Sequence, residues 1–200
     1  MSKVVLASRN QKKLVELRRV LEPLIPGIEV LGLDDVAPFD EPAETEPTFE
    51  GNALVKARAC FAATGLPSLA DDSGICVDAL NGMPGVLSAR WSGAGDKANN
   101  ELLLTQLADV PEERRGAAFV AAVALVWSDG ELVETGRMPG RVLRAEQGDG
   151  GFGYDPLFAA DGNEISNAEL TPEQKDKISH RGQALRALAP HIVAALGTGG

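Results

Sequence analysis

The stretch Leu69-Ala70-Asp71-Asp72-Ser73-Gly74 joins a short apolar segment to two adjacent carboxylates and then to Ser-Gly. This pattern predicts a strand that ends in paired acids and then turns through glycine. Hard cations such as Mg²⁺ prefer carboxylate oxygens and keep several waters, which phosphate oxygens can replace. We therefore interpret Asp71 and Asp72 as a candidate metal site at the edge of a sheet. The alternative, open at this point, is a solvated pair of surface acids.

The N-terminal segment predicts a strand, a short polar turn and a helix. Residues 4–7 are apolar, and leucines then recur at helical spacing at Leu14, Leu17 and Leu21. Asn10 is a candidate N-cap, and a helix N-terminus presents backbone N–H groups that suit a phosphate. Lys13 would add a mobile charge, unless Lys12 and Lys13 simply face solvent. The G-x-x-x-x-G-K-[ST] loop is absent, which excludes a P-loop protein.

A second glycine-rich segment reads Gly-Gly-Phe-Gly-Tyr-Asp-Pro-Leu-Phe over residues 150–158. Glycines let a backbone approach a ligand closely, and Phe152 or Tyr154 offers a flat surface for a base. The alternative is a tight loop whose aromatic rings lie in the core. Lys175, His180 and Arg181 follow, near the start of a helix with an apolar stripe at Leu185, Leu188, Ile192 and Leu196.

Composition limits the classes of partner. The net charge of −10 argues against a nucleic-acid-binding surface, and a polyanionic ligand would need local positive charge. The 2 histidines exclude a three-histidine metal site. Cys60 and Cys76 are too few for a disulfide framework, which favours a reduced, cytoplasmic compartment. No signal segment is visible and no apolar run reaches the ~18 residues of a membrane helix, so we expect no membrane partner.

The periodicities predict an α/β protein with a mixed sheet and flanking helices, and we expect one domain over residues 1–200. An acidic loop is expected over 33–47, a Gly/Pro-rich loop over 81–95, a hairpin turn at Asp129-Gly130, and a frayed tail over 197–200. The expected strands cover residues 3–7, 28–31, 68–70, 74–79, 117–127 and 131–144. The expected helices cover residues 11–22, 49–64 and 96–108 and the C-terminal stripe.

Six motifs, in order and nearly end to end, are similar to those of one family, the inosine/xanthosine triphosphate pyrophosphatases. They are Ser8-x-Asn10-x-x-Lys13, Thr48-Phe49-x-x-Asn52-Ala53-x-x-Lys56-Ala57, Ala70-Asp71-Asp72-Ser73-Gly74, Pro84-Gly85-x-x-Ser88-Ala89-Arg90, Gly151-Phe152-Gly153-Tyr154-Asp155-Pro156-x-Phe158 and Ser179-His180-Arg181-x-x-Ala184-Leu185.

The resemblance implies hydrolysis of non-standard purine nucleoside triphosphates (ITP, dITP, XTP) to the monophosphate and pyrophosphate, with Mg²⁺. It implies that Asp72 is the proton acceptor and a metal ligand, and that Glu44 is a further metal ligand. It also implies an elongated, two-lobed protein with a twisted sheet, a central cleft and a homodimeric assembly. The implied substrate-binding residues are Ser8, Arg9, Asn10, Gln11, Lys12, Lys13, Ser73, Phe152, Gly153, Tyr154, Asp155, Lys175, His180 and Arg181.

One departure from the family pattern concerns the metal. The family has Phe-x-Glu-Asn-Ala where this chain has Phe49-Glu50-Gly51-Asn52-Ala53. Gly51 cannot ligate a metal, and one position along a helix turns a side chain by ~100°, so Glu50 is a poor replacement. We therefore expect Glu44 to carry more of the metal binding.

We assign Arg181 to the 6-oxo group of the purine, with His180 positioning the base, because arginine offers five donors. Two other functions remain open. One is a phosphatase with an aspartate nucleophile, although the Asp-x-Asp spacing is absent at this strand. The other is a nucleotide-binding module without turnover.

Overall fold

The structure, a computed structural model, describes residues 2–196, and within them one six-stranded sheet has the order β2-β1-β3-β4-β5-β6. β1 is parallel to both β2 and β3, whereas β5 and β6 are antiparallel, so the sheet is mixed. This confirms the predicted α/β class. The strands are β1 (Ser2–Leu6), β2 (Ile28–Leu31), β3 (Ser68–Val77), β4 (Gly116–Trp127), β5 (Gly130–Val142) and β6 (Phe158–Ala160).

The helices are α1 (Gln11–Leu24), α2 (Phe49–Thr64), α3 (Asp96–Gln106), α4 (Pro172–Ile178) and α5 (His180–Ala195). Local chemistry explains the ends of α2, whose bounds were predicted correctly. The Thr48 side chain accepts the Gly51 N–H at its start, and Gly65 ends it with a left-handed φ of 67°. α4 was not predicted, because its seven residues are too short for a clear apolar period.

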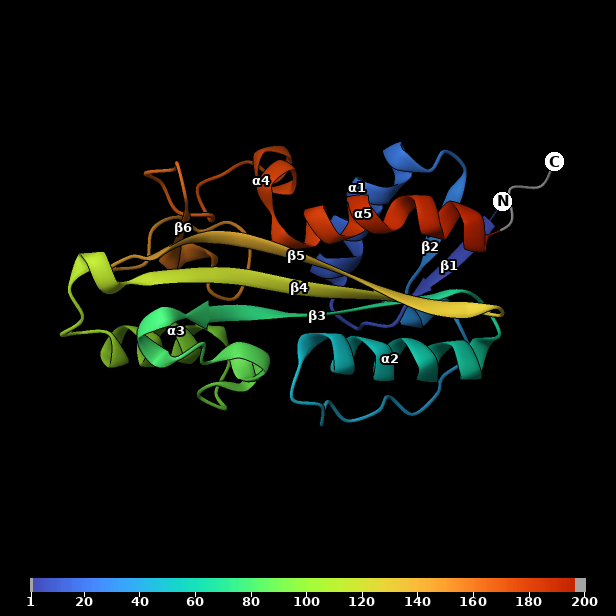
Figure 1. The fold of residues 1–200 in the computed structure, drawn as a ribbon, viewed down its shortest axis with the longest axis horizontal. Coiled ribbons are helices and arrows are strands. Elements are labelled where there is room, and N and C mark those ends of the chain that lie inside the picture. The colour runs from blue at the N-terminus through green and yellow to red at the C-terminus, as the bar shows by residue number, and fades with distance from the viewer. Residues whose placement is uncertain (1, 197–200) are drawn as a thin grey trace. The chain divides into compact units, whose positions relative to one another are not determined.

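The chain divides into two compact units. Of the described residues, unit 1 comprises 2–72, 121–136 and 181–196, and unit 2 comprises 73–120 and 137–180. In unit 1, α1 and α5 cover one face of the strands and α2 covers the other (Figure 1). The unit 1 core includes the fully buried Leu17, Leu69 and Leu185. The predicted C-terminal stripe is thus buried at Leu185, Leu188 and Ile192, with Leu196 packed against it.

Unit 2 has its own core, which includes Ile75, Leu103, Tyr154 and Phe158. α3 and α4 lie on opposite sides of its strands (Figure 1). Two separate apolar cores in one chain give each group of polar side chains described below a rigid local support.

The predicted break after Leu69-Ala70 is wrong. Asp71 and Asp72 lie inside one continuous strand, β3, which is an interior strand of the sheet and not an edge. Gly74 serves close packing rather than a turn. A Cβ at this position would lie 2.3 Å from Ser88 Oγ and 2.4 Å from the Gly85 carbonyl oxygen. Glycine is therefore needed because another segment, the 3₁₀ helix Gly85–Arg90, packs directly on the strand.

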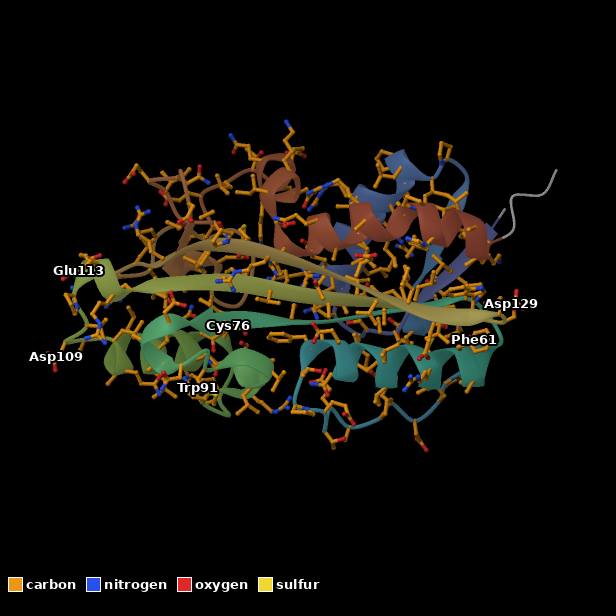
Figure 2. The ribbon with its side chains drawn as sticks, in the orientation of Figure 1. Phe61, Cys76, Trp91, Asp109, Glu113 and Asp129 are labelled. Atoms are coloured by element: carbon orange, nitrogen blue, oxygen red, sulfur yellow. The ribbon has the colours of Figure 1, made fainter. Side chains whose placement is uncertain are left out.

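Several smaller expectations can be compared directly. The hairpin turn is confirmed, with Asp129 at the tip between β4 and β5 (Figure 2). Cys60 and Cys76 are free thiols. Among residues 2–196, no helix is long and apolar enough to cross a membrane. The expected fraying of residues 197–200 lies outside the described residues.

Candidate active site

Unit 1 gathers six polar residues that we call the carboxylate–lysine cluster: Lys13, Glu44, Asn52, Lys56, Asp71 and Asp72. Asp72 is 6% exposed, and its Oδ2 accepts a hydrogen bond from Asn52 Nδ2 at 3.0 Å. Burial raises the pKa of Asp72; Lys56 and Asn52 oppose this shift, and Glu44 adds to it. A carboxylate with a raised pKa is a better proton acceptor near neutral pH.

Lys56 connects the acids of the cluster. Its Nζ lies 2.7 Å from Glu44 Oε1, 3.8 Å from Asp72 Oδ1 and 2.8 Å from the Asp71 carbonyl oxygen. Asn52 and Lys56 are four residues apart on α2, so they lie on one face of the helix. We had assigned no role to either residue, although their spacing inside a motif was a usable signal.

Asp71 faces different partners from those of Asp72. Its side chain is fully buried, with Oδ1 2.9 Å from Lys13 Nζ and Oδ2 accepting from Arg181 Nε at 3.0 Å. Burial alone would raise the pKa of Asp71, but Lys13, Arg181 and Lys56 together hold it well below its usual range. Asp71 therefore stays ionised and braces the cluster.

The assignment of Arg181 to the purine is not supported, because its guanidinium is already engaged within unit 1. Arg181 is 2% exposed, and its Nη1 donates to Glu16 Oε2 at 2.5 Å in addition to the bond to Asp71. The sequence predicts no role for Glu16, the second partner of Arg181. Glu16 is buried in α1, but it lies one position from Leu17 and so outside the leucine stripe of that helix, which left no clear signal in the sequence.

The N-terminus of α1 is capped as predicted. Asn10 Oδ1 accepts from the backbone N–H groups of Lys12 and Lys13, at 3.0 and 3.3 Å, and Ser8 Oγ accepts from Asn10 N. Two of the N–H groups that we had expected to be free for phosphate are therefore already satisfied. Lys13 is the least exposed cation of this segment, with a side chain that is 17% exposed. Burial lowers the pKa of Lys13, and Asp71 opposes that shift.

The other side chains of this segment point elsewhere within unit 1. Arg9 forms an ion pair with Glu41, and Gln11 Nε2 donates to Asp34 Oδ2 at 3.1 Å. Lys12 is exposed. A cavity of about 220 Å³ is lined by Arg9, Leu33, Asp34, Val36, Pro38 and Phe39.

The donor set fits a magnesium ion that keeps phosphate and water ligands. No group of three or more His, Cys, Asp or Glu side chains in the described part of the chain is arranged to hold a metal, so an all-protein cage does not fit. Glu44 and Asp72 are two hard oxygen donors that share the Lys56 ammonium group. Mg²⁺ is commonly held by one or two carboxylates plus substrate phosphates, which matches this pair.

The structure leaves little room for a side chain at Gly51. A Cβ at Gly51 would lie 2.7 Å from Glu46 Cβ and 2.9 Å from Glu46 Cγ. The Glu46 backbone N–H in turn donates to Asn52 Oδ1 at 3.0 Å. The side chain of Glu46 thus fills the space in which a residue 51 side chain would begin.

Unit 2 holds the second group of candidate residues, the aromatic loop, which we define as residues 150–155. Asp155 organises it: Oδ2 accepts the Phe152 backbone N–H at 2.9 Å and lies 2.5 Å from Lys175 Nζ. Lys175 Nζ also lies 5.2 Å from the centre of the Phe152 ring. Gly151 has a φ of +70°, and a Cβ there would lie 2.1 Å from Asp155 Oδ2.

The two aromatic candidates of this loop differ. Tyr154 is 4% exposed, belongs to the unit 2 core and donates its hydroxyl to the Ser88 carbonyl oxygen at 2.9 Å. Tyr154 thus matches the alternative of an aromatic ring that lies in the core. Phe152 is only partly buried and remains the candidate.

The other candidates in unit 2 have clear positions. His180 begins α5, is buried and stacks on Phe119 at 5.0 Å between ring centres. Ser73 is a partly buried residue of β3, next to Asp72 in the chain. Gly153 has a left-handed φ of +60° in the aromatic loop.

Comparison with known proteins adds to this geometry. The Ham1 family matches residues 4–191 of the chain. A dITP/XTP pyrophosphatase of Nocardia farcinica is 61% identical over 198 residues, covering 97% of this chain and 96% of that protein.

Two solved structures are similar to this one. A nucleoside-triphosphatase / dITP/XTP pyrophosphatase from Mycobacterium abscessus is 57% identical, with a TM-score of 0.76, and the match covers 94% of this chain and 99% of that one. A HAM1 protein from Coxiella burnetii is 37% identical, with a TM-score of 0.86, covering 98% of this chain and 100% of that one. The protein therefore belongs to the Ham1 family.

Proposed function

We propose that this protein is a dITP/XTP pyrophosphatase, which hydrolyses ITP, dITP and XTP to the monophosphate and pyrophosphate. The single observation that carries the proposal is the carboxylate–lysine cluster, in which Asp72 and Glu44 share Lys56. Relatives about 60% identical over nearly the whole chain carry this activity in their names.

We propose that Asp72 and Glu44 hold Mg²⁺. The chemistry that Mg²⁺ supplies when bound is neutralisation of phosphate charge and activation of water. Lys13 and Lys56 add two positive charges close to these acids, which is what a triphosphate needs in a protein with a net charge of −10. Ser8, Arg9, Asn10, Gln11, Lys12 and Ser73 complete the proposed phosphate-binding set.

The reaction step assigned to Asp72 is proton acceptance. A water oxygen forms a bond to the α-phosphorus, the bond from this phosphorus to the bridging oxygen breaks, and pyrophosphate leaves with that electron pair. The water proton passes to Asp72, whose raised pKa suits it to the task. Asp71 is a poor candidate for a covalent nucleophile, because its side chain is fully buried between Lys13 and Arg181.

The base is assigned to the aromatic loop. Phe152 is the partly exposed ring, and aromatic stacking suits any purine. Lys175 would add positive charge, His180 would help to position the base, and Gly153, Tyr154 and Asp155 would shape the loop. We now assign Arg181 to bracing Asp71.

The experiment that tests the function is product analysis of ITP incubated with the protein and Mg²⁺, with ATP as the matched substrate. IMP plus pyrophosphate is the expected result, with ATP turned over more slowly. Orthophosphate would indicate a phosphatase, and binding without products would indicate a nucleotide-binding module.

We also propose a homodimer, on the resemblance to the family alone. Equilibrium sedimentation should then give twice the chain mass of 21.0 kDa. A mass of one chain at micromolar concentration would contradict this.

A further inference from the structure

Helix α3 holds the aromatic loop at Gly153 through two residues to which the proposed function gives no role. The Gly153 backbone N–H donates to Asp96 Oδ2 at 2.9 Å, and its carbonyl oxygen accepts from Asn100 Nδ2 at 3.2 Å. Asp96 and Asn100 are four residues apart, so they lie on the same face of α3. Both polar groups of one peptide residue are thus bonded to one helix face.

Gly153 lies at a sharp turn of the aromatic loop, directly after Phe152. Its φ of +60° is left-handed, a conformation that glycine adopts readily and that turns the chain sharply. Gly151 is also left-handed, and Asp155 packs against it while accepting the Phe152 N–H. Phe152 therefore lies between two sharp turns, one held by Asp155 and the other by α3.

Asn100 is itself fixed. It is buried, and its amide nitrogen donates to Glu146 Oε1 at 2.8 Å as well as to Gly153. A buried side chain with two bonds loses little further freedom when the loop binds a ligand, so the loop is pre-organised.

We propose that Asp96 and Asn100 are positioning residues that set the orientation of Phe152 and thereby tune binding of the purine base. The proposal rests on the proposed function for the identity of the ligand, whereas the clamp of α3 on Gly153 can be tested without any ligand.

The first measurement is amide hydrogen exchange of a peptide covering residues 150–154, in protein without ligand. Asp96→Ala removes the acceptor of the Gly153 N–H, so exchange at this amide should speed up about two- to tenfold. Asp96→Asn keeps an oxygen acceptor and should restore most of the protection. Glu101→Ala removes a neighbouring acid of α3 that pairs only with Lys97 among the described ion pairs, and should leave exchange unchanged.

The second measurement separates the base from the phosphates. Asp96→Ala should weaken competitive inhibition by inosine about two- to tenfold while inhibition by pyrophosphate stays within about twofold. Combined with Phe152→Ala, it should cause no further loss of inosine affinity, because both changes act through the same ring. A general loss of stability would instead weaken inhibition by both inosine and pyrophosphate. Its effect on inosine affinity would add to the loss caused by Phe152→Ala.

The outcomes distinguish the two proposals. Unchanged exchange in Asp96→Ala, or a loss of inosine affinity that adds fully to that of Phe152→Ala, would overturn the positioning role. Failure of the wild type to release pyrophosphate from ITP would overturn the proposed function, and the exchange result would still decide whether α3 holds the loop.

Discussion

At the residue scale, Asp71 and Asp72 contact different partners because they are adjacent in a strand. Successive side chains of a strand point to opposite faces. In unit 1, α1 and α5 cover one face and α2 the other (Figure 1). Asp71 accordingly contacts Lys13 of α1 and Arg181 of α5, whereas Asp72 contacts Asn52 and Lys56 of α2.

Asp72→Asn should abolish turnover and leave the fold intact. The amide cannot accept the water proton and is a weaker metal ligand, but it still offers an oxygen to Asn52. We expect kcat for ITP to fall at least about 100-fold with an unchanged thermal midpoint. Asp109→Asn, on an exposed loop labelled in Figure 2, is the matched control. Activity within about threefold of the wild type would remove Asp72 from the mechanism.

Arg181→Ala should destabilise the protein strongly, because it leaves Asp71 and Glu16 buried without their shared cation. Breaking a buried pair costs about 3–5 kcal/mol. Urea unfolding measures the loss in free energy of unfolding, with Arg58→Ala as the control. The side chains of Arg58 and its partner Glu131 are 52% and 41% exposed, so this pair should contribute under about 1 kcal/mol. Equal losses in the two variants would show that the Arg181 pairs are not structural.

At the scale of elements, prediction succeeded where the cause was local. Thr48 caps the start of α2, Gly65 caps its end, and Asn10 caps the start of α1. Such caps can be predicted because they depend on residues close in sequence. Prediction failed where the cause was distant in sequence. In the sequence Gly74 looks like a turn residue, whereas in the structure glycine is needed because Ser88 packs against it. The contact of Arg181 with Glu16 joins residues 165 positions apart.

The close contact between Glu46 and Gly51 of α2 gives a test of the departure from the family pattern. Alanine is favoured over glycine inside a helix by about 1 kcal/mol, but a Cβ here would lie 2.7 Å from Glu46 Cβ. We expect Gly51→Ala to destabilise the wild type and to stabilise a Glu46→Gly background. Denaturant titrations of the four proteins should give a coupling of about 1 kcal/mol or more. The same effect of Gly51→Ala in both backgrounds would contradict the steric explanation.

At the scale of the whole molecule, the two apolar cores raise the question of how many domains unfold. β3, β4 and β5 each carry residues of both units, so separate unfolding of either unit would have to interrupt three strands. We therefore predict that residues 1–200 behave as one domain, with a single calorimetric transition whose van't Hoff and calorimetric enthalpies agree. Two resolved transitions would show two independently stable domains.

The central claim is attack of water on the α-phosphorus, and isotope labelling tests it most directly. ITP is hydrolysed by the wild-type protein with Mg²⁺ in water enriched in ¹⁸O, and the products are separated and weighed by mass spectrometry. The account predicts one ¹⁸O atom in IMP and none in the pyrophosphate. Label in the pyrophosphate, or labelled orthophosphate as the product, would contradict it.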